Sequence, residues 1–336
     1  MRAVRLEAIG DMTMRMVEKP SAEPGEIIVR VLAAGICGSD RHMYKGEYPT
    51  AIPVTLGHEF CGLVEEVGEG VSSFVGGELV TVDPNITCGT CPACRRGRSN
   101  LCANLTAIGV TRDGGFADYV AVPCGQAFTL PPDLDPVHGA FCEPLACCIH
   151  AIDKAQIRPG DSVAILGGGV IGLLMVQLAR LAGADQIILV TRQLSRREAA
   201  LRLGATLALD PTAIDAVAAV KDATHGGVDV IIECAGVPET LQSGVRMARR
   251  GGAFVLFGVT PAGLEVPILP FDLLVNEVEI RPAYLNPFTH ARAAAMVASG
   301  ILELDSLVTK TIGLEDVAGV IGSAPLAGEI KVIVRP

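Results

Sequence analysis

Short apolar runs recur along the second half of the chain, each bounded by glycine, proline or charged residues. They are rich in Val, Ile, Leu and Ala, which is typical of parallel strands buried on both faces. Helix-like segments separate the first of these runs, so the pattern predicts about six parallel strands in a doubly wound α/β sheet. The first two runs lie within residues 161–192, and the others span 205–210, 228–236, 252–259 and 278–284.

Chain length, net charge and cysteine content are consistent with this α/β fold. A chain of 336 residues is long enough for two domains with cores of their own. Its net charge of −10 argues against a nucleic-acid partner, and no apolar run approaches the length of a membrane span. The first residues carry no export signal, so we expect a cytoplasmic protein whose eleven cysteines are thiols or metal ligands.

Four of the cysteines, Cys88, Cys91, Cys94 and Cys102, have the spacing C-x2-C-x2-C-x7-C. Zinc binds four thiolates at tetrahedral corners, and two-residue gaps let a tight loop turn successive sulfurs inward. Such a closed site has no open position, so the spacing predicts a structural zinc. The alternatives are four unliganded thiols and a zinc ribbon for nucleic acid, which the acidic balance opposes.

Possible ligands of a second metal are scattered. Cys37, His58 and Glu59 lie near glycines, and Glu143 precedes a proline. Taken singly, a lone cysteine is usually a small core residue, and such a glutamate can begin a helix. Together they form a plausible catalytic zinc site, because one thiolate, one imidazole and one or two carboxylates leave a position for water or substrate.

These segments together resemble the zinc-dependent medium-chain dehydrogenases, in particular the sorbitol and threonine dehydrogenase branch. The resemblance covers nearly the whole chain. It implies a β-rich, GroES-like catalytic domain of residues 1–149 and 288–336, a Rossmann domain of residues 150–287, and two Zn²⁺ per chain. The matching segments, in family order and spacing, are GICGSDRH, GHEFCGLVEEVG, the four-cysteine loop, GGFADYV, CEPLACCIHA and GGGVIG.

The resemblance also implies roles for single residues. Cys37 and His58 match the first two ligands of the catalytic zinc, and Glu59 matches a carboxylate that approaches or binds the metal. Glu143 fills the third ligand position, directly or through water, in preference to Cys142.

A proton must leave when an alcohol is oxidised. Ser39 lies two residues after Cys37, so its hydroxyl can accept that proton, and His42 can pass it to water. Both match the relay positions of the family. Asp40 is expected either to pair with a ligand histidine or to cap a helix.

The glycines Gly167, Gly169 and Gly172 form G-x-G-x-x-G between an apolar strand and an amphipathic helix. Such glycines let the backbone turn and approach a pyrophosphate, and the N–H groups at the helix start bind its oxygens. Val170 and Ile171, which open the helix, belong to this predicted cofactor site.

The end of the second strand distinguishes between the two nicotinamide cofactors. NAD-binding proteins place a carboxylate there to bind the ribose 2′-hydroxyl. This chain has Thr191 and Arg192, with Arg196 close by, and these side chains suit a 2′-phosphate. The sequence therefore favours NADP(H) over NAD(H), although the arginines could instead only solvate a helix start.

The sequence says less about the substrate. We expect hydride transfer between NADP(H) and a polyol or secondary alcohol or ketone, with amino-alcohol oxidation of the threonine 3-dehydrogenase kind as the alternative. Tyr44 suits a polyol, but Leu285 and Asn286 stand where sorbitol dehydrogenases carry Arg and Tyr. A non-catalytic, zinc-stabilised nucleotide-binding protein is the alternative from another class. The family forms dimers and tetramers, so we expect a homodimer or homotetramer.

Overall fold

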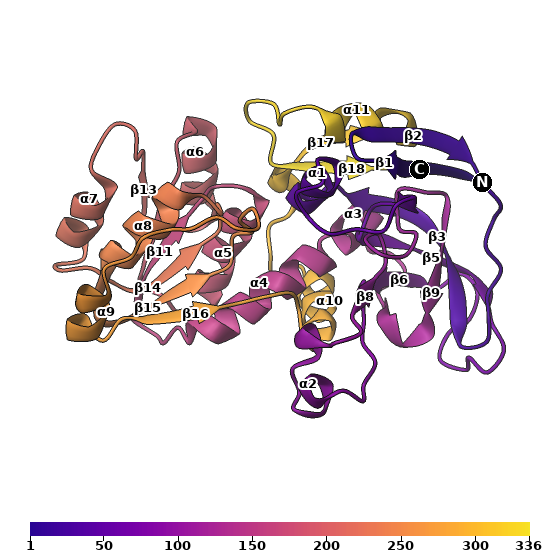
Figure 1. The fold of residues 1–336 in the computed structure, drawn as a ribbon, viewed down its shortest axis with the longest axis horizontal. Helices are drawn as coiled ribbons and strands as arrows, with labels where there is room; N and C mark the ends of the chain where they lie inside the picture. Colours follow the sequence, from indigo (N-terminus) through magenta and orange to yellow (C-terminus); the bar gives the residue numbers. More distant parts are fainter. The chain divides into compact units, whose positions relative to one another are not determined.

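The computed structural model describes all 336 residues, which form two compact units (Figure 1). Unit 1 consists of Met1–Ala146 and Asn286–Pro336, and unit 2 consists of Cys147–Leu285. The chain thus leaves unit 1, builds unit 2 and returns to unit 1. None of the helices combines the length and the apolar character that a membrane span requires.

Unit 1 is rich in β-structure. Its strands are β1 (Arg2–Ala8), β2 (Asp11–Met16), β3 (Glu26–Gly35), β4 (Val54–Thr55), β5 (Glu59–Val67), β6 (Leu79–Val82), β7 (Asn85–Ile86), β8 (Thr106–Ala107), β9 (Tyr119–Pro123), β10 (Ala127–Thr129), β17 (Val308–Ile312) and β18 (Lys331–Val334). Seven of them form one sheet in the order β10-β6-β5-β3-β18-β17, with β9 also paired to β3. A three-stranded sheet, β2-β1-β4, and the pair β7-β8 complete the unit.

Strand β18 brings a late segment of the chain into the middle of the large sheet. It pairs antiparallel with β3, where Ile333 faces Gly35, and parallel with β17. In Figure 1 the yellow β18 accordingly lies beside the indigo and purple strands of unit 1. Apolar side chains of β3, β5 and β6, among them Ile27, Phe60 and Val80, form the core.

The helices of unit 1 are short. They are α1 (Gly38–Tyr44), α2 (Pro92–Arg95), α3 (Pro136–Gly139), α10 (His290–Ser299) and α11 (Val317–Gly322), with the 3-10 turns η1 (Ser99–Leu101), η2 (Cys124–Gln126), η3 (Asp305–Leu307) and η4 (Leu314–Asp316). Helix α4 (Cys142–Ala155) begins in unit 1 and ends in unit 2.

Unit 2 contains the six parallel strands that the sequence predicts, in the order β13-β12-β11-β14-β15-β16. The first three strands run outward in one direction and the last three in the other, which is doubly wound topology. The strands are β11 (Ser162–Leu166), β12 (Gln186–Val190), β13 (Leu207–Leu209), β14 (Val228–Glu233), β15 (Ala248–Leu256) and β16 (Glu279–Pro282).

Five helices follow the strands of unit 2: α5 (Val170–Leu181), α6 (Leu194–Leu203), α7 (Ala216–Ala223), α8 (Pro238–Met247) and α9 (Pro270–Asn276). Helix α5 packs with α6, and α7 packs with α8. Right-handed crossovers in opposite directions from β11 put these pairs on opposite faces of the sheet. The carboxyl ends of β11, β12 and β14 therefore meet at one edge, where nucleotides bind in this topology.

Candidate metal and cofactor sites

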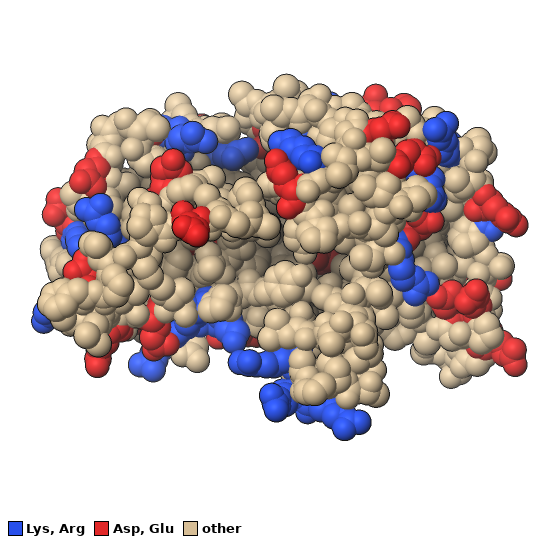
Figure 2. All heavy atoms as spheres, in the orientation of Figure 1, with Lys and Arg blue, Asp and Glu red and all other residues tan.

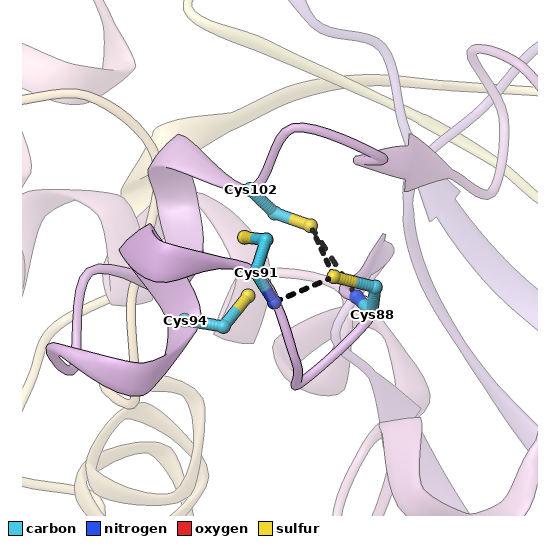
Figure 3. Close-up of side chains that lie close together, drawn as sticks. All are labelled: Cys88, Cys91, Cys94 and Cys102. Carbon is cyan, nitrogen blue, oxygen red and sulfur yellow. Dashed lines mark hydrogen bonds between the residues drawn. The ribbon is translucent and has the colours of Figure 1, made fainter.

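The four cysteines of the C-x2-C-x2-C-x7-C loop lie together in unit 1. All four sulfurs are within 4.8 Å of one another, and Figure 3 shows them pointing into a common space. The Sγ atoms of Cys88 and Cys102 are 3.5 Å apart, and the amide of Cys91 donates to Cys88 Sγ at 3.4 Å. The loop thus presents the four thiols that a closed zinc site requires.

Local sequence explains how this loop turns. Cys91 precedes α2, whose first residue is Pro92, and Gly89 and Gly97 adopt positive φ angles of 68° and 73°. Glycine adopts such angles at little cost. The amides of Thr90 and Cys91 lower the pKa of Cys88 to about 5. One sulfur is therefore ready to ionise.

The Cys94 sulfur, in contrast, resists ionisation when no cation is present. Burial and the neighbouring thiols of Cys91 and Cys102 raise the pKa of Cys94 to about 12. A divalent cation removes this conflict, since it stabilises all the thiolates at once. Basic side chains also gather over the lobe that carries α2 (Figure 2), where Arg95, Arg96 and Arg98 are exposed.

A second group of possible ligands is buried in unit 1. Its members are Cys37, which precedes α1, and His58 and Glu59, where β5 begins. Their ligand atoms also lie within 4.8 Å of one another. His58 is 7% exposed and Glu59 is 2% exposed, so this group is shielded from solvent more than the four cysteines are.

Asp40 fulfils both roles expected from the sequence. Its Oδ2 atom accepts a hydrogen bond from the Cys37 amide at 2.8 Å and caps α1, whereas Oδ1 lies 3.5 Å from His58 Nδ1. A carboxylate at one ring nitrogen orients an imidazole and leaves the other nitrogen for a metal. Here that other nitrogen, Nε2, lies 3.3 Å from Ser39 Oγ.

The charges around His58 fit a cation. Burial alone would lower the pKa of His58, but the Asp40 carboxylate and the Cys37 sulfur raise it well above its ordinary value. The Asp40 carboxylate and the Cys37 sulfur thus favour a positive charge at this position. A metal ion can supply that charge in place of a proton, as imidazole ligation requires.

Lys331, at the start of β18, completes this buried group. Its Nζ forms an ion pair with Glu59 and donates to the Ile36 carbonyl at 3.2 Å. Burial alone would lower the pKa of Lys331, but Glu59, Cys37 and Glu143 raise it. The ammonium thus holds the Glu59 carboxylate, which the sequence predicts to approach or bind a catalytic zinc.

A glycine makes room for this ion pair. Gly35 lies at the end of β3, and a Cβ atom there would be only 2.7 Å from Lys331 Cε. Any larger residue would displace Lys331 or Glu59. The tight packing explains why a glycine stands two residues before Cys37.

Glu143 does not belong to the close group of Cys37, His58 and Glu59. It lies in the first turn of α4, is 6% exposed, and is close enough to Lys331 to affect its pKa. The neighbouring Cys142 also lies outside that close group, and burial raises the pKa of its thiol to about 12.

The two predicted relay residues differ in their surroundings. Ser39 and His42 are three residues apart on α1, so they share one face of the helix. Ser39 contacts His58, whereas His42 Nδ1 lies 2.7 Å from Glu47 Oε2. Glu47 had not been singled out from the sequence.

The glycine turn of unit 2 follows the predicted pattern. Gly167 has a φ of 109°, Gly169 caps α5, and the helix starts at Val170 and Ile171. A Cβ atom on Gly172 would collide with the Gly167 carbonyl oxygen. The close approach of helix and strand therefore requires glycine there.

The end of β12 carries no carboxylate of its own. Thr191 is buried, and its Cγ2 would be 2.9 Å from a Cβ on Gly168, so it lies against the glycine turn. Arg197 reaches back to the carbonyls of Thr191 and Arg192 at 2.9 and 2.7 Å and pairs with Asp210 at 2.9 Å. The acid nearest to this strand end is thus already neutralised.

The other arginines are placed differently. Arg192 is exposed just beyond β12, and Arg196 is half-buried in the first turn of α6. Arg197, the next residue along α6, instead shapes the loop.

Sequence reasoning missed Lys331, Glu47 and the Arg197–Asp210 pair. Lys331 had a signal in the sequence. It is the one charged residue of the otherwise apolar strand KVIV, and a buried lysine must find a partner. The other two depend on turns whose geometry is not visible in the sequence.

Comparison with known proteins identifies the family. Residues 23–132 match the alcohol dehydrogenase GroES-like domain, and residues 170–298 match the zinc-binding dehydrogenase family. Sorbitol dehydrogenase of Bacillus subtilis is 35% identical over 322 residues, which are 94% of this chain and 91% of that protein. L-threonine 3-dehydrogenase of Pyrococcus abyssi is 35% identical over 304 residues, 87% of this chain and 86% of that protein.

Among solved structures, a zinc-binding dehydrogenase of Sinorhizobium meliloti 1021 bound to NADP is similar to the whole chain. It is 52% identical, with a TM-score of 0.97 over 100% of this chain and 99% of that one. The chain therefore belongs to the zinc-dependent medium-chain dehydrogenase family and is an alcohol or polyol oxidoreductase.

Proposed function

We propose that the protein transfers hydride between NADP(H) and a polyol or secondary alcohol, or the corresponding ketone. The observation that carries this proposal is the buried group of Cys37, His58 and Glu59, with the Ser39 hydroxyl 3.3 Å from His58 Nε2. Alcohol oxidation needs a cation for the substrate oxygen and a neighbouring group that takes its proton, and this group can provide both.

Two zinc ions per chain follow from the two clusters of possible ligands. Cys37 and His58 would hold the catalytic zinc, with Glu59 and Glu143 as carboxylates that bind directly or through water. Cys88, Cys91, Cys94 and Cys102 would hold a structural zinc. Bound zinc supplies Lewis acidity toward the substrate oxygen.

The proton would leave along α1. Ser39 is placed to accept it from the substrate hydroxyl, and His42, one helical turn later, is placed to pass it to solvent. In ketone reduction the same groups would return the proton. Hydride itself moves between the substrate carbon and the nicotinamide.

Unit 2 is the proposed cofactor domain. Gly167, Gly169, Val170, Ile171 and Gly172 would bind the pyrophosphate through backbone N–H groups. The exposed guanidinium of Arg192, together with Arg196 and the hydroxyl of Thr191, supports a 2′-phosphate at the end of β12. The neutralisation of Asp210 by Arg197 supports it further, since a free carboxylate there would repel a phosphate.

Substitution at the end of β12 tests the cofactor assignment. Arg192→Ala should raise the KM for NADPH about tenfold and leave that for NADH nearly unchanged, because only NADPH carries the 2′-phosphate. Thr191→Asp should act in the same direction and favour NADH. Arg202→Ala, an exposed arginine on α6, is the matched control. An equal rise in the KM values for NADPH and NADH would refute the assignment of a 2′-phosphate site.

The substrate class is best tested with a panel. Polyols, vicinal diols, simple secondary alcohols and L-threonine would each be scored by NADPH absorbance in zinc-replete protein. Threonine oxidation is the second candidate, supported by the relative in Pyrococcus abyssi. Oxidation of threonine alone would establish it and reject the polyol proposal.

The polyol role of Tyr44 has less support. Its hydroxyl already donates to the Gly10 carbonyl at 2.7 Å, and Asn286 is buried with its Oδ1 accepting from Asn85. These groups are therefore committed to structure in the absence of substrate.

Metal analysis separates an enzyme from a non-catalytic binding protein. An enzyme of this design should contain about two zinc ions per chain, whereas a binding protein stabilised only by the cysteine loop should contain about one. One zinc and no turnover on the whole panel would support the latter.

We also propose a cytoplasmic homodimer or homotetramer. All eleven cysteines are free, which suits a reducing compartment. Strand β16 is an edge of its sheet, and Phe271 and Leu274 on α9 are 71% and 75% exposed. An open edge beside exposed apolar side chains supports contact with another copy. Light scattering would give the mass, and a monomer at micromolar concentration would contradict the proposal.

A further inference from the structure

His42, in the last turn of α1, is paired with Glu47, a carboxylate beyond the helix end to which the proposed function gives no role. His42 Nδ1 lies 2.7 Å from Glu47 Oε2, and the side chains are 34% and 40% exposed. The pair therefore lies at the boundary between protein and water, where a proton path from a buried site must end.

The backbone fixes this contact. The amides of Lys45, Gly46 and Glu47 donate to the carbonyls of Arg41, Met43 and His42 at 3.1, 3.0 and 2.8 Å. The chain thus folds back over the end of α1. Gly46 makes the reversal with a φ of 75°, an angle that glycine readily adopts.

The helix below the pair is held firmly. Met43 is fully buried, and Arg41 donates to the Val320 carbonyl at 2.5 Å and pairs with Glu329 at 3.0 Å. His42 and Glu47 therefore meet on a fixed support.

A carboxylate at one nitrogen determines which tautomer a neutral imidazole adopts. If Glu47 accepts the proton of Nδ1, the lone pair of His42 is on Nε2. Without that acceptor, the two neutral tautomers are free to exchange. Of the charged groups nearby, Arg41 is occupied by Glu329, and Lys45 is exposed without a contact to the ring.

We infer that Glu47 is a positioning residue of the proton relay, which holds His42 with Nδ1 protonated and Nε2 ready to accept. During alcohol oxidation His42 Nε2 gains the proton that left the substrate hydroxyl. His42 then releases that proton from Nε2 to water, while Nδ1 keeps its own proton in the hydrogen bond to Glu47. The proton that enters the ring also leaves it, so His42 returns to its neutral starting tautomer.

This inference rests on the proposed function and is tested with two variants. Glu47→Ala removes both the acceptor and the charge, and Glu47→Gln keeps an acceptor oxygen. Glu69→Gln is the control, since Glu69 is an exposed glutamate of unit 1 with no side-chain partner. His42→Ala identifies the His42 signals among the six histidines.

The first measurement does not depend on activity. Long-range ¹H–¹⁵N NMR of histidine-labelled, zinc-replete protein should show His42 protonated at Nδ1 in the wild type and in Glu47→Gln. In Glu47→Ala it should change to a mixture dominated by the Nε2-protonated form. An unchanged tautomer in Glu47→Ala would overturn the inference.

The second measurement is turnover with NADP⁺ at low and high buffer concentration. Glu47→Ala should lower kcat/KM about tenfold in weak buffer, and added imidazole should restore most of it, because a small base can carry the proton. In Glu47→Gln, kcat/KM in weak buffer should fall only about threefold, because the amide oxygen still accepts the hydrogen bond from Nδ1. A loss that buffer does not rescue would mark Glu47 as merely structural and overturn the inference.

These outcomes separate two failures. If the wild type oxidises alcohols but Glu47→Ala behaves like Glu69→Gln, only the role of Glu47 is wrong. If zinc-replete wild type fails to turn over any alcohol on the panel, the proposed function falls and the relay falls with it.

Discussion

The two cysteine-containing clusters of unit 1 solve different physical problems. The four-cysteine loop draws all its ligands from residues 88–102, presents four identical groups, and is partly exposed. The second cluster joins Cys37, His58 and Glu59 with Lys331 from a distant strand, and it is deeply buried.

The difference lies in what balances the charge. In the loop, only a bound cation can relieve four crowded sulfurs, since no ammonium or carboxylate lies among them. In the buried cluster, Asp40 lies 3.5 Å from His58 and Lys331 forms an ion pair with Glu59, so protein groups of opposite charge already face both residues. The proposed catalytic site would exchange ligands during turnover and would benefit from such supports, whereas the proposed structural site would need only to be closed.

Removing a ligand of the buried cluster should have the largest effect. Cys37→Ser should lower kcat by at least about 10³-fold, because the cation that activates the substrate oxygen is lost. Zinc content should fall from about two to about one per chain, while NADPH binding, followed by its fluorescence, stays nearly unchanged. Substantial activity in this variant would refute the zinc-based chemistry.

Breaking the ion pair between Lys331 and Glu59 should have the second-largest effect. Lys331→Met should reduce the free energy of unfolding by about 3–5 kcal/mol, since it leaves a buried carboxylate without its partner. It should also change zinc affinity, which competition with a chelator would measure. Lys331→Arg keeps the charge and serves as the matched control. Equal stability of Lys331→Met and wild type would mean that the pair contributes nothing.

The corresponding change in the loop should act locally. Cys94→Ser should remove one zinc and lower the thermal midpoint, yet kcat per remaining chain should stay within about threefold, because a closed site takes no part in the reaction. Metal analysis, calorimetry and turnover of the same preparation measure all three. A loss of activity as large as that of Cys37→Ser would erase the distinction between the clusters.

The second buried histidine, His290, shows by contrast what Asp40 does for His58. His290 packs 4.9 Å from the Phe128 ring and has no carboxylate partner, and burial lowers its pKa to about 3. The unfolded chain, with a pKa near 6.5, therefore binds more protons between pH 3 and 6.5, so this contribution is complete above that range and is lost as the pH falls. From pH 7 to pH 5 the loss should be about 2 kcal/mol.

Chemical denaturation at pH 7 and pH 5 tests this smallest effect. His290→Gln should show less loss of stability between the two pH values than the wild type. His225→Asn, at an exposed histidine with a φ of 55°, should lose as much stability between pH 7 and pH 5 as the wild type does. The same loss of stability between pH 7 and pH 5 in all three proteins would show that His290 does not titrate as its burial implies.

Much of unit 2 could be predicted because its information is local. Five of the six strands contain an apolar run, β16 being the exception, and the glycines of the turn lie within six consecutive residues. Helix α9 was not expected, since its apolar side chains lie largely exposed rather than along a core-facing stripe.

The site in unit 1 was only partly predictable. Cys37, His58 and Asp40 stand in recognisable segments, but Lys331 meets Glu59 only because β18 lies beside β3. Contacts across so many residues depend on sheet order, which the hydrophobic pattern does not encode. Side-chain choices such as that of Arg197 for Asp210 depend on loop geometry in the same way.

The position of β18 in the large sheet constrains how the protein matures. Lys331 is translated only after every residue of unit 2, whereas Glu59 emerges far earlier. Until then the growing polypeptide leaves β3 open on one side and a lone acidic group near its end. The nucleotide-binding half can consequently finish folding on the ribosome first, and the metal-binding half is the last to become competent.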